Sequence, residues 1–227
     1  MNPTVEKLVQ LFRRLSEHAQ YTELLTSVET RIVEWRWATG PMLPQIPFDE
    51  IATGFKSPHW TEQPPKNGWL HGLDANERSV YARTGDRDQP YQKVREQFWL
   101  YEDTGFFWVG FDESAKKNLL AVTWYEVKAS RWLSSWKLNA YGITETLLYW
   151  GDNRFEGYVN RYWRNPSSND LNVAEEATLD PANVDGGMHY QYTFDAKGRL
   201  ERVTEASAIT PDQPHAVTYS RISRKGT

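Results

Sequence analysis

Residues 97–163 decide the fold, and they read QFWLYEDTGFFWVGFDESAKKNLLAVTWYEVKASRWLSSWKLNAYGITETLLYWGDNRFEGYVNRYW. This stretch holds seven of the chain's eleven tryptophans, together with many tyrosines and phenylalanines. Aromatic side chains favour the pleated, half-buried surface of a β-sheet. Short polar clusters at residues 102–105, 112–114 and 151–153 interrupt the run, as turns would. The pattern therefore predicts consecutive antiparallel strands joined in chain order, which is a meander.

Composition indicates a packed domain without a membrane helix. Of the 227 residues, 39% are apolar and 14% are aromatic, which favours a folded chain over a disordered one. The chain has no apolar run of about 18 residues, so we expect no membrane partner. Its first residues lack the basic-then-apolar order of a signal peptide. The lack of cysteine excludes disulfides and fits the cytoplasm, where we expect the protein.

The N-terminal part is predicted to be helical. Asn2 is a suitable N-cap, Pro3 suits the first helical position, and apolar residues follow at helical spacing up to Leu15. These features predict a helix over residues 3–19. Residues 21–37 fit either a helix or a strand, and we favour a second helix that ends before Gly40.

A proline-rich segment separates the helical part from the sheet. Residues 39–67 contain six prolines, at positions 41, 44, 47, 58, 64 and 65. Proline is disfavoured inside sheets, so we expect this segment to cross a sheet face or edge, with a lid or binding loop as the alternative.

The whole chain is predicted to form one α+β, β-rich domain. Its helical segment 1–38 and its covering loop 39–67 would pack on a large twisted antiparallel meander at 68–227. A half-closed β-barrel is the alternative.

Two hairpins in the predicted sheet use similar turns. Asp74 opens the turn between residues 69–73 and 78–83, and Asp195 opens the turn between residues 192–194 and 199–203. Asp can bond the backbone of its own turn, and Gly198 supplies a residue that tolerates a left-handed conformation. Glu77 stands where the second turn has Gly198, so it must accept a costlier conformation or a different turn.

The second hairpin resembles a known repeat. Residues Tyr192 to Thr204 resemble one copy of the YD repeat of bacterial Rhs-type proteins, in which an aromatic residue and Asp are followed by two variable residues and Gly-Arg-Leu. The resemblance covers about 13 of the 227 residues. It implies a hairpin and a bacterial origin.

An acidic loop is predicted at residues 165–187, with a solvated surface as the plain interpretation. Neither Lys nor Arg occurs between Asn165 and Ala196. The first functional hypothesis is a non-enzymatic bacterial interaction protein, for example an immunity protein that binds a basic toxin. The net charge of −4 argues against nucleic acid as a partner. The candidate partner-binding residues are Asp170, Glu175, Glu176, Asp180 and Asp185.

The second hypothesis is a small-molecule or carbohydrate-binding domain with a cleft lined by tryptophan, and it includes an enzyme as a possibility. Its candidate residues are Trp124, Trp136, Trp150, His71 and His189. A His–carboxylate dyad would pair His71 or His189 with Asp74 or Asp185. No catalytic motif and no metal-ligand spacing occurs, so we name no catalytic residue and expect no cofactor and no metal. The sequence does not indicate an oligomeric state.

Overall fold

The computed structural model describes residues 2–54, 56–66, 68–84, 96–112, 117–152, 154–164, 184–209 and 215–220. Three helices and thirteen strands lie in these ranges. The helices are α1 (Pro3–Leu15), α2 (His18–Glu29) and α3 (Asp49–Thr53). The first strands are β1 (Glu34–Ala38), β2 (Trp60–Thr61), β3 (Trp69–Leu73), β4 (Ser79–Thr84), β5 (Glu96–Glu102) and β6 (Gly105–Phe111). They are followed by β7 (Leu119–Lys128), β8 (Arg131–Asn139), β9 (Gly142–Trp150), β10 (Phe155–Arg164), β11 (Gly186–Phe194), β12 (Leu200–Ser207) and β13 (Ala216–Ser220).

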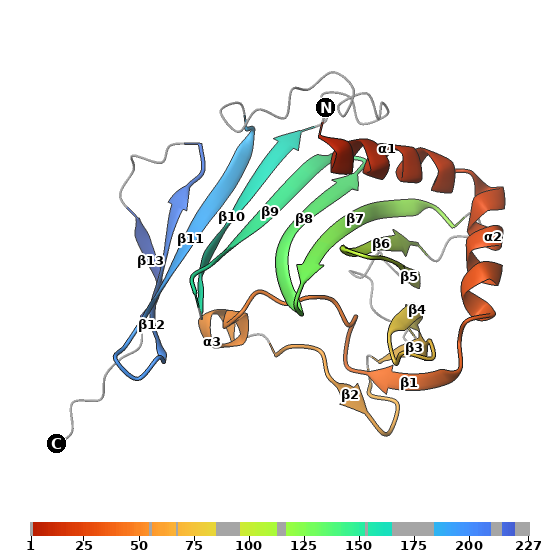
Figure 1. Ribbon diagram of the computed structural model, residues 1–227, viewed down its shortest axis with the longest axis horizontal. Coiled ribbons are helices and arrows are strands. Elements are labelled where there is room, and N and C mark those ends of the chain that lie inside the picture. The colour runs from red at the N-terminus through yellow and green to blue at the C-terminus, as the bar shows by residue number, and fades with distance from the viewer. Residues whose placement is uncertain are drawn as a thin grey trace.

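All thirteen strands belong to one antiparallel sheet, and its part from β3 onward is the meander that the sequence predicted, whereas β1 and β2 lie in segments predicted to be helix and covering loop. From β3 to β13 each strand pairs with the next along the chain, and β1 is inserted between β3 and β2 at one edge. The sheet curls strongly but stays open, so the fold is the predicted α+β meander and its strands do not close into a barrel (Figure 1).

One face of the sheet is covered by the first two helices. Helix α1 lies across β7 and β8, and α2 lies beside β4 (Figure 1). The apolar stripe of α1, from Val5 to Leu15, joins a core with Phe98, Phe107 and Ile143 of the sheet. The helical spacing in the sequence therefore identified a core-facing stripe.

Two predicted boundaries in the N-terminal part are wrong. Helix α1 ends at Leu15, four residues before the predicted end, because Ser16 caps it and its hydroxyl donates to the Phe12 carbonyl at 2.8 Å. The preferred second helix would have run to the residues before Gly40, but α2 ends at Glu29 and Glu34–Ala38 form β1. Residues 34–38 pair with β3 through the backbone, a long-range contact that local spacing does not encode.

The opposite face of the sheet holds two further clusters. Trp69, Trp99 and Trp108 form the first, and Leu43 packs against it. Phe155, Tyr158 and Tyr192 belong to the second, against which Ile46, Phe48 and Ala52 pack. The proline-rich segment therefore contributes to both clusters on this face.

The two similar hairpins have the same turn. Asp74 Oδ1 accepts from the backbone N–H groups of Asn76 at 2.9 Å and Arg78 at 3.1 Å. Asp195 Oδ1 accepts in the same way from Lys197 at 2.9 Å and Arg199 at 3.0 Å. Both hairpins also have a register shift two residues before the aspartate, between Gly72 and Leu73 in one and between Thr193 and Phe194 in the other.

The residue before the arginine is left-handed in both turns. Gly198 has φ 72° and Glu77 has φ 56°. Glu77 thus takes the costlier conformation, which was the first of the two predicted outcomes.

Candidate functional site

Strand register aligns a row of side chains across the centre of the helix-covered face. Phe107 on β6 lies opposite Trp124 on β7, Trp124 opposite Trp136 on β8, and Trp136 opposite Glu145 on β9. Glu145 in turn lies opposite Arg161 on β10. Cross-strand neighbours such as these share one face and touch. An aromatic row therefore ends in an ion pair.

A second row runs parallel to the first, nearer the strand ends. Glu126 on β7 lies opposite Ser134 on β8, and Ser134 lies opposite Leu147 on β9. The Ser134 hydroxyl donates to Glu126 Oε2 at 2.7 Å. Ser134 is only 6% exposed, so this hydroxyl is held beneath the surface while the carboxylate reaches outward.

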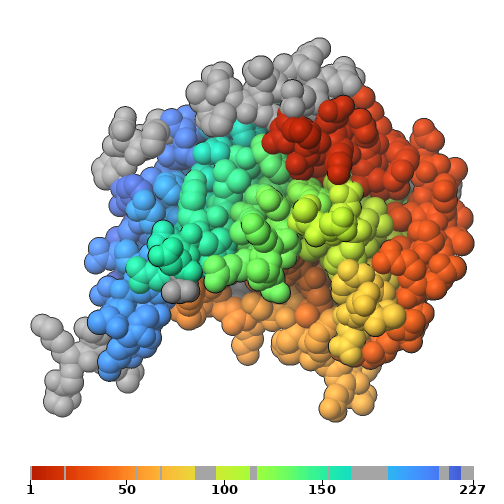
Figure 2. Space-filling view, viewed as in Figure 1, coloured from red at the N-terminus to blue at the C-terminus, as the bar shows by residue number. Residues whose placement is uncertain are grey.

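These rows form one side of a cleft whose other side is the start of α1. We call this cavity, of about 490 Å³, the Trp cleft. Figure 2 shows α1 in red bordering the green central strands. The residues that line it are Asn2, Pro3, Thr4, Lys7, Glu102, Thr104, Phe107, Trp124, Glu126, Ser134, Trp136, Glu145 and Leu147. A cleft of this size with an apolar floor and a few polar groups is typical of small-molecule sites.

The tryptophans of the cleft form its floor and leave little ring surface open. Trp124 and Trp136 are each 8% exposed. Trp136 stacks on Trp163 with 5.9 Å between ring centroids, and Phe107 packs on Trp124 at 4.7 Å. Their ring faces are therefore packed against other core aromatics. The groups of the cleft that a ligand can reach belong to polar side chains.

Three carboxylates supply hydrogen-bond acceptors. Glu145 is 7% exposed and accepts from Arg161 Nη1 at 2.8 Å. At the rim, Lys7 Nζ lies 3.2 Å from Glu102 Oε2, and both side chains are well exposed. Buried Glu145 is held by a charge-assisted hydrogen bond, whereas the exposed Lys7–Glu102 pair contributes little and can open.

The structure brings together only two of the five predicted cleft residues, Trp124 and Trp136. Trp150 lies on the opposite face, where its Nε1 donates to the Trp132 carbonyl at 2.9 Å. The reason is the short β8–β9 hairpin, in which Asn139 pairs with Gly142. Even-numbered residues of β8 consequently share a face with odd-numbered residues of β9, and Trp150 points away from the cleft.

His71 is also on the opposite face and is fully buried. Its Nε2 lies 3.2 Å from the Gly40 carbonyl and its Nδ1 lies 3.0 Å from the Ser79 hydroxyl. A carbonyl only accepts, so Nε2 carries the proton and Nδ1 accepts from Ser79. Burial lowers the pKa of His71, and the hydrogen bond to Gly40 raises it. Burial has the larger effect, so the pKa falls to about 4.

His189 shares the cleft's face but lies on β11, two strands beyond Leu147. Its ring contacts Tyr149 and His215, with centroids 5.8 and 6.4 Å away. Burial, followed by the neighbouring His215 and Arg161, lowers the pKa of His189.

The predicted dyads do not form. Asp74 binds Arg78 and Arg31, while His71 binds Ser79 and Gly40. Within the ranges that the structure describes, no group of three or more His, Asp or Glu side chains could hold a metal ion.

Of the five acidic candidates, only Asp185 is among the described residues; Asp170, Glu175, Glu176 and Asp180 lie outside them. The Asp185 N–H donates to the Tyr162 carbonyl at 2.9 Å, and its carboxylate accepts from the Arg164 N–H at 2.6 Å. Asp185 therefore caps the β10–β11 connection. Binding of a basic toxin, and the bacterial origin and cytoplasmic location that go with it, stay predictions.

Sequence reasoning missed Glu126, Ser134 and Glu145. A signal for Glu145 was present, because it stands between Ile143 and Leu147 at two-residue spacing, where a core-facing strand position is expected to be apolar. A charged residue in such a position indicates a buried partner or a site.

Two comparisons with known proteins give no match. No protein-family model matches the chain, and no curated protein matches it significantly. Among the described residues, none of the helices has the length and apolar character needed to cross a membrane.

Proposed function

We propose that this protein is a binding domain that holds a small, hydrogen-bond-donating molecule in the Trp cleft. The observation that carries the proposal is the pairing of an aromatic floor, Trp124 and Trp136, with two acceptors, the exposed Glu126 and the buried Glu145, in one cavity of about 490 Å³. An ionised carboxylate accepts hydrogen bonds and cannot donate them. A complementary ligand must therefore carry the hydrogen-bond donors. The sequence hypothesis of a cleft lined by tryptophan supports the same class of function.

The chemistry of the cleft favours an amine over a sugar that stacks on an open ring. Stacking needs an accessible aromatic face, and the faces of Trp124 and Trp136 are packed against Phe107 and Trp163. Of the three carboxylates in the lining, Glu145 is paired with Arg161 and Glu102 with Lys7, whereas Glu126 accepts from the neutral Ser134 hydroxyl. A positively charged donor is therefore the better complement.

The proposal is one of binding without a catalytic step. Glu145 is held by Arg161 and Glu126 by Ser134, so both carboxylates are positioned as fixed acceptors.

A cleft-blocking variant tests the proposal. Thr104 is an exposed residue at the rim, so Thr104→Trp should fill the opening without disturbing the core. Thr22→Trp is the matched control, since Thr22 is also exposed, lies on α2 and does not line the cleft. We expect amine-containing fragments in a ligand-observed NMR screen to bind the wild type and Thr22→Trp, and to lose binding at least about tenfold in Thr104→Trp. If the screen gives no ligand, or the ligands bind both variants equally, the proposed function is wrong.

A further inference from the structure

A second hollow lies further along the same face of α1, toward its C-terminal end, and adjoins the Trp cleft. It also has a volume of about 490 Å³ and lies between α1 and β5–β6. Its lining consists of Lys7, Gln10, Leu11, Arg14, Leu100, Tyr101, Glu102 and Phe107. Lys7, Glu102 and Phe107 line both cavities, so the two hollows meet beneath the first turns of the helix.

The two hollows differ in charge. The second hollow has two cationic side chains, Lys7 and Arg14, and one carboxylate, Glu102. The Trp cleft has three carboxylates and one cation. The Trp cleft under the start of α1 therefore suits a cationic group, and the second hollow under the later turns of α1 suits an anionic group.

The boundary between the hollows is a weak pair over an apolar base. The Lys7 and Glu102 side chains are 60% and 42% exposed at 3.2 Å, and ion pairs this exposed are readily replaced. Below them, Phe107 is 6% exposed and lines both cavities. A ligand that supplied its own charges to Lys7 and Glu102 could lie across Phe107 with an apolar chain.

We propose that the two hollows together bind one elongated zwitterion, whose amine and carboxylate are separated by an apolar chain. The ammonium occupies the Trp cleft beside Glu126 and Glu145, and the carboxylate occupies the second hollow beside Lys7 and Arg14. This inference rests on the proposed function and extends it from an amine ligand to a ligand with both charges.

Three probes of equal chain length separate the contribution of the ammonium from that of the carboxylate. They are 6-aminohexanoate, hexylamine and hexanoate, each titrated into the full chain by calorimetry or NMR. We expect 6-aminohexanoate to bind at least about tenfold more tightly than either singly charged probe, because both ends are then recognised.

Two variants test which hollow binds the carboxylate of the ligand and which binds its ammonium. Arg14→Gln should weaken 6-aminohexanoate and hexanoate several-fold and leave hexylamine unchanged. Glu126→Gln should weaken 6-aminohexanoate and hexylamine and leave hexanoate unchanged. Arg13→Gln is the matched control, since Arg13 is exposed on the same turn of α1 and lines neither hollow.

The outcomes separate the inference from the proposed function. If hexylamine binds as tightly as 6-aminohexanoate, and Arg14→Gln changes neither, the site holds an amine and the zwitterion inference is overturned. If none of the three probes binds while the fragment screen yields ligands blocked by Thr104→Trp, the inference also fails and the proposed function stands. If neither set binds, both are overturned.

Discussion

The turns at 74–78 and 195–199 share a local design but differ in their surroundings. In each, the aspartate accepts two backbone hydrogen bonds and pairs with the arginine four residues later, at 2.8 Å in the first and 2.7 Å in the second. The Asp74 side chain is 7% exposed and the Asp195 side chain is 24% exposed. The same local interactions therefore operate in a buried setting and in an open one.

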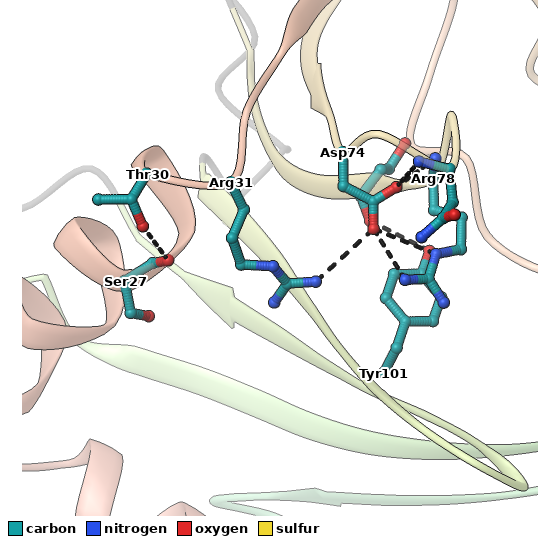
Figure 3. A network of polar contacts seen from close by, with 8 residues as sticks. Ser27, Thr30, Arg31, Asp74, Arg78 and Tyr101 are labelled. Carbon is teal, nitrogen blue, oxygen red and sulfur yellow. Dashed lines mark hydrogen bonds and ion pairs between the residues drawn. The ribbon is translucent and has the colours of Figure 1, made fainter.

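The buried turn is tied to the rest of the fold. Arg31, which follows α2, lies 3.7 Å from Asp74, and the Arg78 guanidinium lies over the Tyr101 ring at 4.3 Å (Figure 3). Burial alone would raise the pKa of Asp74, but hydrogen bonds from Arg78 and Asn76 outweigh it and hold the pKa below its usual value. The comparison teaches that a turn's sequence fixes its geometry, while tertiary contacts set its contribution to stability.

Replacing each aspartate is the strongest test of this comparison. Asp74→Ala should lower the free energy of unfolding by about 3 kcal/mol, because it leaves two part-buried backbone N–H groups and two arginines without their acceptor. Asp195→Ala removes the same local bonds from an exposed turn and should cost much less. Urea denaturation of both variants measures the difference, and equal losses would show that burial has no effect here.

The equivalent buried positions differ in their response to pH. His71 and Tyr192 both stand three residues before the turn aspartate, and only His71 titrates in the acid range. Its pKa is about 4 in the folded state and 6.5 ordinarily, so between these values the unfolded chain binds more protons. Stability should therefore fall as pH is lowered from 6.5 to 4, by roughly 3 kcal/mol from this residue.

His71→Gln provides the control for the acid response, because it keeps a donor for Gly40 and cannot titrate. The difference in unfolding free energy between wild type and variant should change with pH in that range. Parallel curves from pH 7 to 4 would contradict the assignment of His71 as a neutral buried group.

Glycine 198 tests the cost of the left-handed position in the open turn. A Cβ added at Gly198 meets no atom within 4 Å, so Gly198→Ala introduces backbone strain without a clash. We expect a loss of about 1 kcal/mol in unfolding free energy. A variant as stable as the wild type would show that the turn tolerates any residue there.

The reverse change at Glu77 should have the smallest effect. Glu77→Gly relieves the left-handed strain but gives the unfolded chain more freedom, so the net gain should be only about 0.5 kcal/mol. Thermal unfolding is sensitive enough to detect it, and a clear loss of stability would indicate that the Glu77 side chain makes a contact that outweighs the strain.

Much of the fold could be predicted because its signals are local. Alternation, aromatic content and turn residues mark the strands, and each strand from β3 onward pairs with its neighbour in sequence. For β1 the helix was preferred over the strand because Trp35 also fits a helical pattern with Val28 and Ile32, and only pairing with β3 decides between the two. The β-branched and aromatic content of residues 33–37 carried a weak strand signal.

The site was harder to predict because face assignment depends on register. Trp124 and Trp136 face the cleft while Trp150 does not, and the difference follows from one two-residue turn at 140–141. Composition shows that tryptophans are present but not which face of the sheet they occupy. A one-residue change in the register of a strand would move each of its side chains to the opposite face.

Helix α1 covers strands that are encoded far from it. About 100 residues separate the end of α1 at Leu15 from the start of β7 at Leu119. All of them must be synthesised before α1 can pack on β7. The hairpins close locally and should form quickly, whereas docking of α1 must wait for them. During synthesis the apolar stripe of α1 therefore lacks its partners in the sheet until β7 and β8 are present, and both hollows come into existence only when the helix docks. Under the proposed function, a ligand in the Trp cleft should therefore stabilise the docked position of α1.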